Sequence, residues 1–207
     1  MGDYWNDLWA NPDIQEYMEY AVGYTTANPE FLDIFAQHNI KKVCDAACGF
    51  GAYSIMLLNK GFEVYGFDIS YNSIYLTERI LTNLGLPVGG YRICSITDIS
   101  YPDMFFDGVV ANAVLDHLSA TDADVALEEL HRIVKPGGLI YISFDAISED
   151  DTKKAHTLLE DGSFLYKDGL RFKYYADNDI SDLLKDKCIV FSRTAQKGTR
   201  EVILQNN

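Results

Sequence analysis

Two aspartates flank a glycine-rich segment with a spacing suited to binding a nucleoside. Asp45 ends one short apolar run, Gly49 and Gly51 follow it, and Asp68 ends the next apolar run. Glycine lets the backbone approach a ligand because it has no Cβ. A carboxylate only accepts hydrogen bonds, so Asp68 suits the two hydroxyls of a ribose. Ligands of open parallel sheets bind outside the carboxyl ends of the strands, where both aspartates would lie.

Two details of this segment discriminate between nucleoside ligands. Enzymes that bind NAD share the layout, but their GxGxxG pattern needs a third glycine where Ser54 stands. Asp45 places a carboxylate beside the turn, which is unfavourable next to a diphosphate and favourable next to an ammonium group. The residues therefore favour S-adenosylmethionine, which joins an adenosine to a sulfonium and an amino-acid tail. An NAD-dependent oxidoreductase on a related sheet stays open as the alternative.

Seven short apolar runs, with helical patterns between most of the first five, must position these residues. The runs are Lys42–Asp45, Phe62–Phe67, Tyr91–Cys94, Phe106–Asn112, Leu139–Phe144, Cys188–Phe191 and Val202–Leu204. Strands that alternate with helices predict a parallel sheet, and a short polar link between the last two runs predicts an antiparallel hairpin. We therefore expect an α/β fold: a Rossmann-like three-layer sandwich with a mostly parallel seven-stranded sheet and an antiparallel C-terminal hairpin.

Capping signals predict where several helices begin. Asn28, followed by Pro29 and Glu30, predicts a helix with Asn28 as its N-cap. Ser70 or Asn72 would cap a later helix. The segment 121–124 resembles a capping box in front of another helical pattern.

Four segments resemble, in order, the motifs of class I S-adenosylmethionine-dependent methyltransferases of the small single-domain branch. They are Asp45-Ala46-Ala47-Cys48-Gly49-Phe50-Gly51, Gly66-Phe67-Asp68-Ile69-Ser70, Phe106-Asp107-Gly108-Val109-Val110 with Asn112-Ala113-Val114-Leu115, and Leu130-His131-Arg132-Ile133-Val134-Lys135-Pro136-Gly137-Gly138. The resemblance covers roughly residues 40–145. It implies methyl transfer from S-adenosylmethionine to an O, N or S nucleophile of a small molecule, mainly by positioning and desolvation, with S-adenosylhomocysteine as the product. A non-catalytic protein that binds this cofactor is a further alternative.

The resemblance also implies which residues contact the cofactor, and one position departs from the family pattern. The implied contacts are Asp45, Ala46, Ala47, Gly49, Gly51, Asp68, Ile69, Ser95, Ile96, Asn112 and Val114. The family usually has an aspartate after the third strand that accepts a hydrogen bond from the adenine amino group. Ser95 stands at that position here, and Asp98 lies three residues late. The residue that reads the adenine therefore stays open.

His117 is the candidate general base. It follows the fourth predicted strand and should lie near the methyl group, where a neutral imidazole could take a proton from the acceptor. The alternative is a structural histidine. In the more basic segment that follows the fifth strand, Arg171 and Lys173 could recognise an acid group on the acceptor, or could belong to a solvated face.

The absence of a linker-like stretch predicts one domain over residues 1–207. Within it we expect an N-terminal cap (1–27), a cofactor-binding core (40–145), a substrate-side insertion (146–186) and the C-terminal hairpin (187–207). The cap is rich in aromatic residues, which could wall the cofactor or only pack as a hydrophobic helix. They are Tyr4, Trp5, Trp9, Tyr17, Tyr20 and Tyr24.

Charge and composition limit the partners. The chain has 31 acidic and 17 basic residues, a net charge of −14, and the first 40 residues contain no Lys or Arg. Such a surface disfavours nucleic acids and anionic membranes. No apolar run is long enough to span a bilayer, and no signal-peptide pattern opens the sequence. The four cysteines lack paired zinc-ligand spacing, so we expect no metal site and a cytoplasmic protein with reduced thiols.

Overall fold

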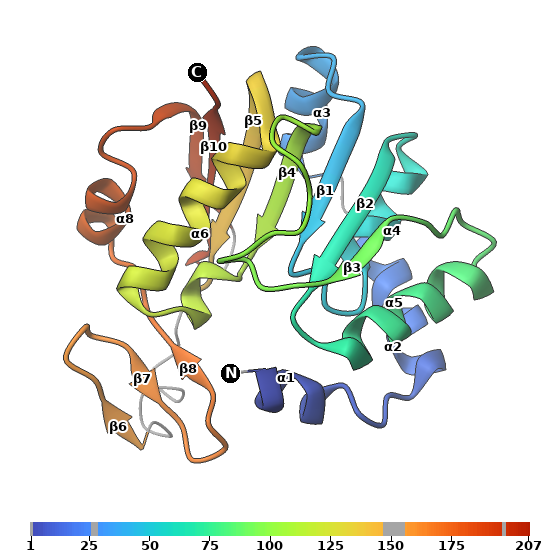
Figure 1. The fold of residues 1–207 in the computed structure, drawn as a ribbon, viewed down its shortest axis with the longest axis horizontal. Coiled ribbons are helices and arrows are strands. Elements are labelled where there is room, and N and C mark those ends of the chain that lie inside the picture. Colours follow the sequence, from blue (N-terminus) through green and yellow to red (C-terminus); the bar gives the residue numbers. More distant parts are fainter. Residues whose placement is uncertain (1, 26–28, 147–155, 196–197) are drawn as a thin grey trace.

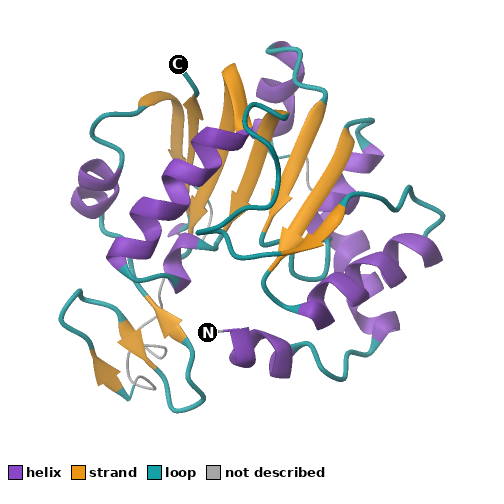
Figure 2. Ribbon diagram, viewed as in Figure 1, coloured by secondary structure: helices purple, strands orange, loops and turns teal. Residues whose placement is uncertain are grey.

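The core of the molecule is a seven-stranded sheet (Figures 1 and 2). The structure is a computed structural model that describes residues 2–25, 29–146, 156–195 and 198–207. In their order across the sheet, the strands are β3 (Tyr91–Ile93), β2 (Glu63–Asp68), β1 (Lys42–Ala46), β4 (Phe106–Asn112), β5 (Val134–Phe144), β10 (Arg200–Gln205) and β9 (Cys188–Thr194). The first five pair in parallel, and β10 is antiparallel to both β5 and β9. The predicted sheet and its C-terminal hairpin are confirmed.

Helices cover both faces of the sheet, which makes the three expected layers. The helices are α2 (Ile14–Thr25), α3 (Glu30–Gln37), α4 (Ala52–Asn59), α5 (Tyr71–Asn83), α6 (Ala120–Ile133) and α8 (Asp177–Leu183). Successive β1 residues enter different cores: Cys44 belongs to the buried cluster that includes residues of α6 and α8, whereas Val43 belongs to the cluster that includes residues of α3 and α4. Strands that are buried on both faces read as continuous apolar runs, and this is why the sequence revealed them.

Two helix starts differ from the predictions or refine them. Ser70 caps α5, since its Oγ accepts a hydrogen bond from the Ser73 N–H at 3.1 Å. The capping box predicted at 121–124 is wrong, because Ser119 Oγ already accepts the Asp122 N–H at 3.0 Å and the helix begins at Ala120. Helix α3 has Pro29 at its N-cap position, and the predicted cap Asn28 lies outside the described residues.

The start of β5 also differs from the prediction. The strand begins at Val134, directly after α6, rather than at Leu139. Val134 pairs with Phe106 and Leu139 pairs with Gly108, so the intervening proline and glycines form a bulge. A Cβ at Gly138 would lie 2.4 Å from the Asp107 carbonyl oxygen, so only glycine fits there.

Two small elements lie beyond the carboxyl ends of β1, β2 and β4 (Figure 1). One is helix α1 (Gly2–Leu8). The other is a three-stranded antiparallel sheet of β6 (Thr157–Leu158), β7 (Phe164–Leu165) and β8 (Arg171–Phe172). Strands of two residues have no detectable period, so the sequence did not predict this sheet. Among the described helices, none has the length and apolar character needed to cross a membrane.

Candidate active site

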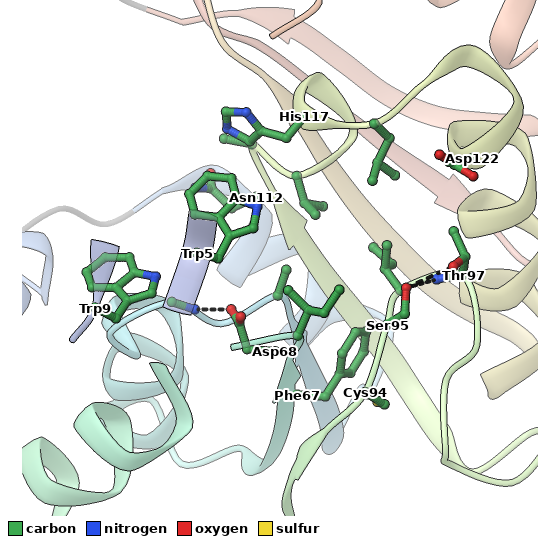
Figure 3. Close-up of a pocket in the computed structure, with 17 residues that line it drawn as sticks. Trp5, Trp9, Phe67, Asp68, Cys94, Ser95, Thr97, Asn112, His117 and Asp122 are labelled. Atoms are coloured by element: carbon green, nitrogen blue, oxygen red, sulfur yellow. Dashed lines mark hydrogen bonds between the residues drawn. The ribbon is translucent and has the colours of Figure 1, made fainter. Parts of the chain in front are cut away.

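A cavity of about 380 Å³ lies at the carboxyl ends of the central strands (Figure 3). Its volume falls in the usual range of small-molecule sites. The lining residues are Trp5, Trp9, Ala47, Gly49, Phe67, Asp68, Ile69, Cys94, Ser95, Ile96, Thr97, Asn112, Ala113, Val114, His117, Leu118 and Asp122. Most of the predicted contacts therefore meet in one place, but Asp45, Ala46 and Gly51 are not part of the wall.

Asp68 occupies the end of β2 and is held by backbone donors. Its Oδ2 accepts the Gly49 N–H at 3.0 Å, and its Oδ1 accepts the Ser70 N–H at 2.9 Å (Figure 3). Burial raises the pKa of Asp68, and these hydrogen bonds act in the opposite direction. Each carboxylate oxygen keeps a further lone pair, so the side chain can still accept hydrogen bonds from a ligand in the cavity.

The glycine turn between β1 and α4 has left-handed backbone at several residues. The φ angle is +56° at Gly49, +82° at Gly51 and +55° at Ala47. A Cβ at Gly51 would lie 2.8 Å from Thr77 Cγ2, so α5 packs closely against the turn. Thr77 Oγ1 also donates a hydrogen bond to the Gly49 carbonyl at 2.8 Å. Gly51 therefore shapes the turn without lining the cavity.

Asp45 lies beneath this turn rather than in the cavity wall. It is 3% exposed, and its Oδ2 accepts a hydrogen bond from Ser54 Oγ at 2.6 Å. Burial raises the pKa of Asp45 to about 7. Ser54 is the residue that replaces the third glycine of the dinucleotide pattern, and its hydroxyl is used to hold this buried carboxyl. The structure thus gives Asp45 a partner within the protein at the position where a ligand contact was expected.

The ends of β4 and β5 are linked by a side-chain network. Ser143 is fully buried; its Oγ donates to Asn112 Oδ1 at 2.8 Å and accepts the Ala113 N–H at 2.9 Å. Because Asn112 Oδ1 is an acceptor in this network, its NH₂ group is left for the cavity. Ala113 has φ +48°, a left-handed conformation that is uncommon for a residue with a Cβ. Both Ala47 and Ala113 are strained in this way and line the cavity, and such strain tends to cluster at functional sites.

His117 ends the short 3₁₀ helix η1 (Leu115–His117) and lines the cavity. Its Nδ1 lies 2.9 Å from the Arg171 carbonyl oxygen, which can only accept, so Nδ1 carries the hydrogen. Burial lowers the pKa of His117, so the ring is neutral at pH 7. In this tautomer Nε2 holds the lone pair that a general base needs.

Helix α1 supplies an aromatic wall. The Trp5 ring meets the His117 ring edge to face, with centroids 4.9 Å apart, and Tyr4 packs on Trp5 at 5.0 Å. Two hydrogen bonds of 2.9 Å fix the helix, one from Ser70 Oγ to Asn6 Oδ1 and one from Asn72 Nδ2 to the Asn6 carbonyl.

Only part of the predicted aromatic set belongs to this wall. Trp9 lines the cavity beside Gly49, and the Tyr17 ring meets the Trp9 ring edge to face. Tyr20 is exposed, and the side chain of Tyr24 lies outside the described residues.

Arg171 and Lys173 do not line the cavity, contrary to one of the two alternatives raised by the sequence. The Arg171 guanidinium forms an ion pair with Asp161 and also donates to Ser163 Oγ at 3.0 Å. Lys173 Nζ lies 4.0 Å from Asp179 and over the ring of Tyr175. Among the described lining residues there is no Lys or Arg, so none of them supplies a fixed positive charge for an anionic group on the acceptor.

Comparisons with known proteins show what the chain is similar to. A family model described as a methyltransferase domain matches residues 44–142. The chain is 35% identical over 111 residues to a tRNA (carboxymethyluridine(34)-5-O)-methyltransferase of Arabidopsis thaliana, a match that covers 53% of this chain and 25% of that protein. It is 30% identical over 149 residues to the ubiquinone/menaquinone biosynthesis C-methyltransferase UbiE of Xanthomonas campestris pv. campestris, covering 66% and 58%. The chain thus spans between a quarter and about three fifths of the length of these curated relatives.

Solved structures share the fold. A SAM-dependent methyltransferase from Methanosarcina mazei has a TM-score of 0.73 at 24% identity, covering 86% of this chain and 98% of that one. A Burkholderia thailandensis 1,6-didemethyltoxoflavin-N1-methyltransferase, solved with its substrate and S-adenosylhomocysteine, has a TM-score of 0.67 at 16% identity, covering 97% and 81%. The chain is thus similar to methyltransferase domains over residues 44–142 and shares the fold of solved methyltransferases.

Several residues that line the cavity were not expected from the sequence. Thr97, Leu118 and Asp122 line the cavity, although none of them belongs to a segment that resembles a family motif. Leu118 and Asp122 enter because the chain turns back from η1 into α6 directly above the strand ends. For Asp122 the available signal was a polar residue in the first turn of a helix, three residues after the cap Ser119. A sequence pattern does not show whether such a residue faces a cavity or the solvent.

Proposed function

We propose that the chain transfers the methyl group of S-adenosylmethionine to an O, N or S nucleophile of a small molecule. The observation that carries the proposal is the arrangement of Asp68 and the glycine turn. A fixed, acceptor-only carboxylate at the end of β2 faces a cavity whose floor is left-handed backbone. This arrangement supports ribose binding by Asp68, with the methionine tail over Gly49 and Ala47.

The other lining residues fit the remaining parts of the cofactor. Ile69, Ile96, Val114 and Leu118 provide apolar surface for a purine ring. Asn112 lines the cavity near the strand ends, and its NH₂ group, which is not the part that contacts Ser143, would face the methionine tail. Neither part of the wall holds a basic side chain that would repel the sulfonium.

The bound cofactor supplies an already activated methyl group, so the chain's main contribution is position and exclusion of water. Trp5 and His117 close the side of the cavity next to Asn112. We assign His117 Nε2 as the atom that takes the proton of an acceptor hydroxyl or amine, because Nδ1 is engaged by Arg171. An acceptor that arrives already deprotonated would need no such base.

The proposed organisation is one domain in which residues 1–27 and 146–186 flank the acceptor side of the cofactor core. Helix α1 supports this view, since Trp5 reaches His117. Strand β8 supports it too, since the Arg171 carbonyl holds the same imidazole. A small-molecule acceptor is favoured over nucleic acid by the net charge of −14. One relative is named a tRNA methyltransferase, so tRNA belongs among the substrates tested.

Calorimetry tests the cofactor assignment. Wild-type protein should bind S-adenosylhomocysteine with micromolar affinity and should not bind NAD. Asp68→Ala removes hydrogen bonds to a charged acceptor, each worth about 1.5–3 kcal/mol, so affinity should fall at least about 100-fold. Asp98→Ala is the matched control, because Asp98 is exposed and does not line the cavity. Equal affinity of the Asp68→Ala and parent proteins would refute the proposal.

A screen with methyl-labelled S-adenosylmethionine tests transfer itself. Small molecules with phenol, amine or thiol groups form one arm, and total tRNA forms the other. Label in the small-molecule arm alone supports the proposal. Label in tRNA alone would overturn the proposed acceptor class, and no label in either arm would favour a protein that binds the cofactor without catalysis.

A further inference from the structure

The adenine end of the cavity contains a carboxylate that no motif assigned. Figure 3 shows Asp122 on the same side of the pocket as Ser95 and Thr97, with Trp9 at the opposite side. We propose that Asp122, at the start of α6, reads the adenine amino group in place of the aspartate missing after β3. This inference rests on the proposed function and specifies a selectivity residue within it.

Hydrogen bonds between α6 and the loop after β3 fix their relative position. Glu129 Oε2 accepts the Ile99 N–H at 2.8 Å, and Arg132 donates to the Ile99 carbonyl at 2.8 Å and to the Tyr101 carbonyl at 3.0 Å. Asp122 lies seven residues before Glu129, which is two turns of the helix and the same face. The face of α6 that holds Ile99 is therefore the face that carries Asp122.

The distances along helix and loop agree with this placement. Seven helical residues span about 10 Å. Two to four residues, from Ile99 back to Thr97 or Ser95, reach at most about 7–13 Å. Asp122 therefore comes level with Ser95 and Thr97, and all three line one cavity.

The polar atoms at this end complement adenine. Asp122 Oδ2 accepts the Ser119 hydroxyl at 2.7 Å, whereas Oδ1 makes no hydrogen bond to any residue that the structure describes. A carboxylate oxygen in this state accepts from an amino group. Ser95 Oγ and Thr97 Oγ1 are 2.8 Å apart and share one hydroxyl hydrogen, so the other is left to donate to a ring nitrogen. Ile96 and Leu118, both buried, provide the apolar surroundings.

The nearby Asp98 is not a competing reader. Its side chain is exposed, it does not line the cavity, and its N–H donates to the Ser95 carbonyl at 3.1 Å as part of a tight turn. The turn directs the residue away from the pocket, so the aspartate closest in sequence to the family position is not the one that faces the ligand.

The test compares two ligands that differ at one group. S-inosylhomocysteine carries a carbonyl oxygen where S-adenosylhomocysteine carries the amino group, so it would place an acceptor against the Asp122 carboxylate. Calorimetry on wild-type protein should show S-adenosylhomocysteine bound at least about tenfold tighter. Asp122→Asn can donate from its amide to that carbonyl, so the ratio of the two affinities should fall at least about tenfold or invert.

Three variants separate recognition from helix stability. Asp124→Asn changes an exposed carboxylate on the same helix, and Asp98→Asn changes the sequence-adjacent candidate; both should keep the wild-type ratio. Ser119→Ala removes the helix cap and one hydrogen bond to Asp122 Oδ2 but keeps the carboxylate, so it should lower the melting temperature and change the ratio less than Asp122→Asn does. An unchanged ratio in Asp122→Asn, or an equal change in Ser119→Ala, would overturn the inference. If wild-type protein bound neither ligand, the proposed function itself would fail.

Discussion

Replacing Asp45 with asparagine tests whether a proton-binding carboxyl is buried under the glycine turn. Burial raises the pKa of Asp45 to about 7, although the hydrogen bonds from Ser54 act in the opposite direction. An aspartate in an unfolded chain has a pKa of about 4. The folded and unfolded states therefore bind different numbers of protons between about pH 4 and pH 7.

The size of the effect on stability follows from the difference between the folded and unfolded pKa values of Asp45. Below about pH 4 the carboxyl is neutral in both states and burial costs nothing in charge. As the pH rises towards 7 the unfolded chain releases the proton while the folded chain keeps it, so the free energy of unfolding falls. A pKa difference of about three units lowers the free energy of unfolding by on the order of 4 kcal/mol, and this loss is complete above about pH 7. Asparagine still accepts from Ser54 and does not titrate, so the variant lacks this loss.

Urea unfolding followed by tryptophan fluorescence at pH 5, 6, 7 and 8 measures the effect. The free energy of unfolding of Asp45→Asn, minus that of the parent, should increase by at least about 2 kcal/mol from pH 5 to pH 8. Asp33→Asn, at an exposed position of α3, should show a flat difference. Other groups with raised pKa values, such as Asp116 at about 8, cancel in the subtraction. A flat difference for Asp45→Asn would show that the buried carboxyl is ionised throughout, and would refute the reasoning.

Three further substitutions have defined outcomes. His117→Ala should lower kcat about 10²- to 10⁴-fold for an acceptor that must lose a proton and leave S-adenosylhomocysteine affinity within about tenfold. Because burial lowers the pKa of His117, the parent rate should be flat above pH 6.5 and fall in acid, and a variant with the parent's pH profile would contradict its role as the base. Ser143→Ala removes the partner of Asn112 and of the Ala113 N–H, so cofactor affinity should weaken about tenfold by calorimetry while the fold is retained. Gly51→Ala forces a Cβ into Thr77 at positive φ, so urea unfolding should show a loss of about 1–3 kcal/mol; unchanged stability would mean that the turn relaxes.

The sheet and the cofactor edge could be predicted from the sequence because their signals are local. Buried parallel strands read as apolar runs, and positive φ after β1 demands glycine at Gly49 and Gly51. Asp68 could be placed because a strand end fixes both the position and the direction of the residue that follows. These features depend on a few neighbouring residues, so their pattern survives without knowledge of the packing.

The parts of the site that the sequence left open depend on contacts between distant segments. Trp5 reaches His117 only because Asn6 is held by Ser70 and Asn72, 64 and 66 residues away in the chain. The sequence left Arg171 as a candidate ligand contact, but its guanidinium pairs with Asp161 in the structure. Contacts between distant segments leave no periodic pattern in the sequence. The composition therefore suggested aromatic and basic candidate residues but did not show which of them face the cavity.

The position of Asp45 shows a related limit. The sequence correctly identified a carboxylate next to the glycine turn and a serine in place of the third glycine, but treated them as separate facts. In the structure Ser54 donates to Asp45, so the two departures from the dinucleotide pattern are one interaction. A hydroxyl one turn into the helix satisfies a buried carboxyl that would otherwise be costly. Serine in place of the third glycine is therefore explained by its hydrogen bond to Asp45 beneath the turn, as well as by the kind of ligand that the turn accepts.

The distribution of charge acquires a chemical meaning once the pairings are known. Several basic side chains in the described C-terminal part pair with acids, as in Arg171–Asp161, Lys187–Glu128 and Arg193–Glu201. The cavity wall that the structure describes holds Asp68 and Asp122 with no Lys or Arg. Under the proposed function, transfer of the methyl group converts a cationic sulfonium into a neutral thioether. An acidic wall attracts the cofactor more strongly than the product, because the product is a zwitterion that lacks the sulfonium charge. The same acidic excess that disfavours nucleic acid therefore also favours exchange of product for fresh cofactor.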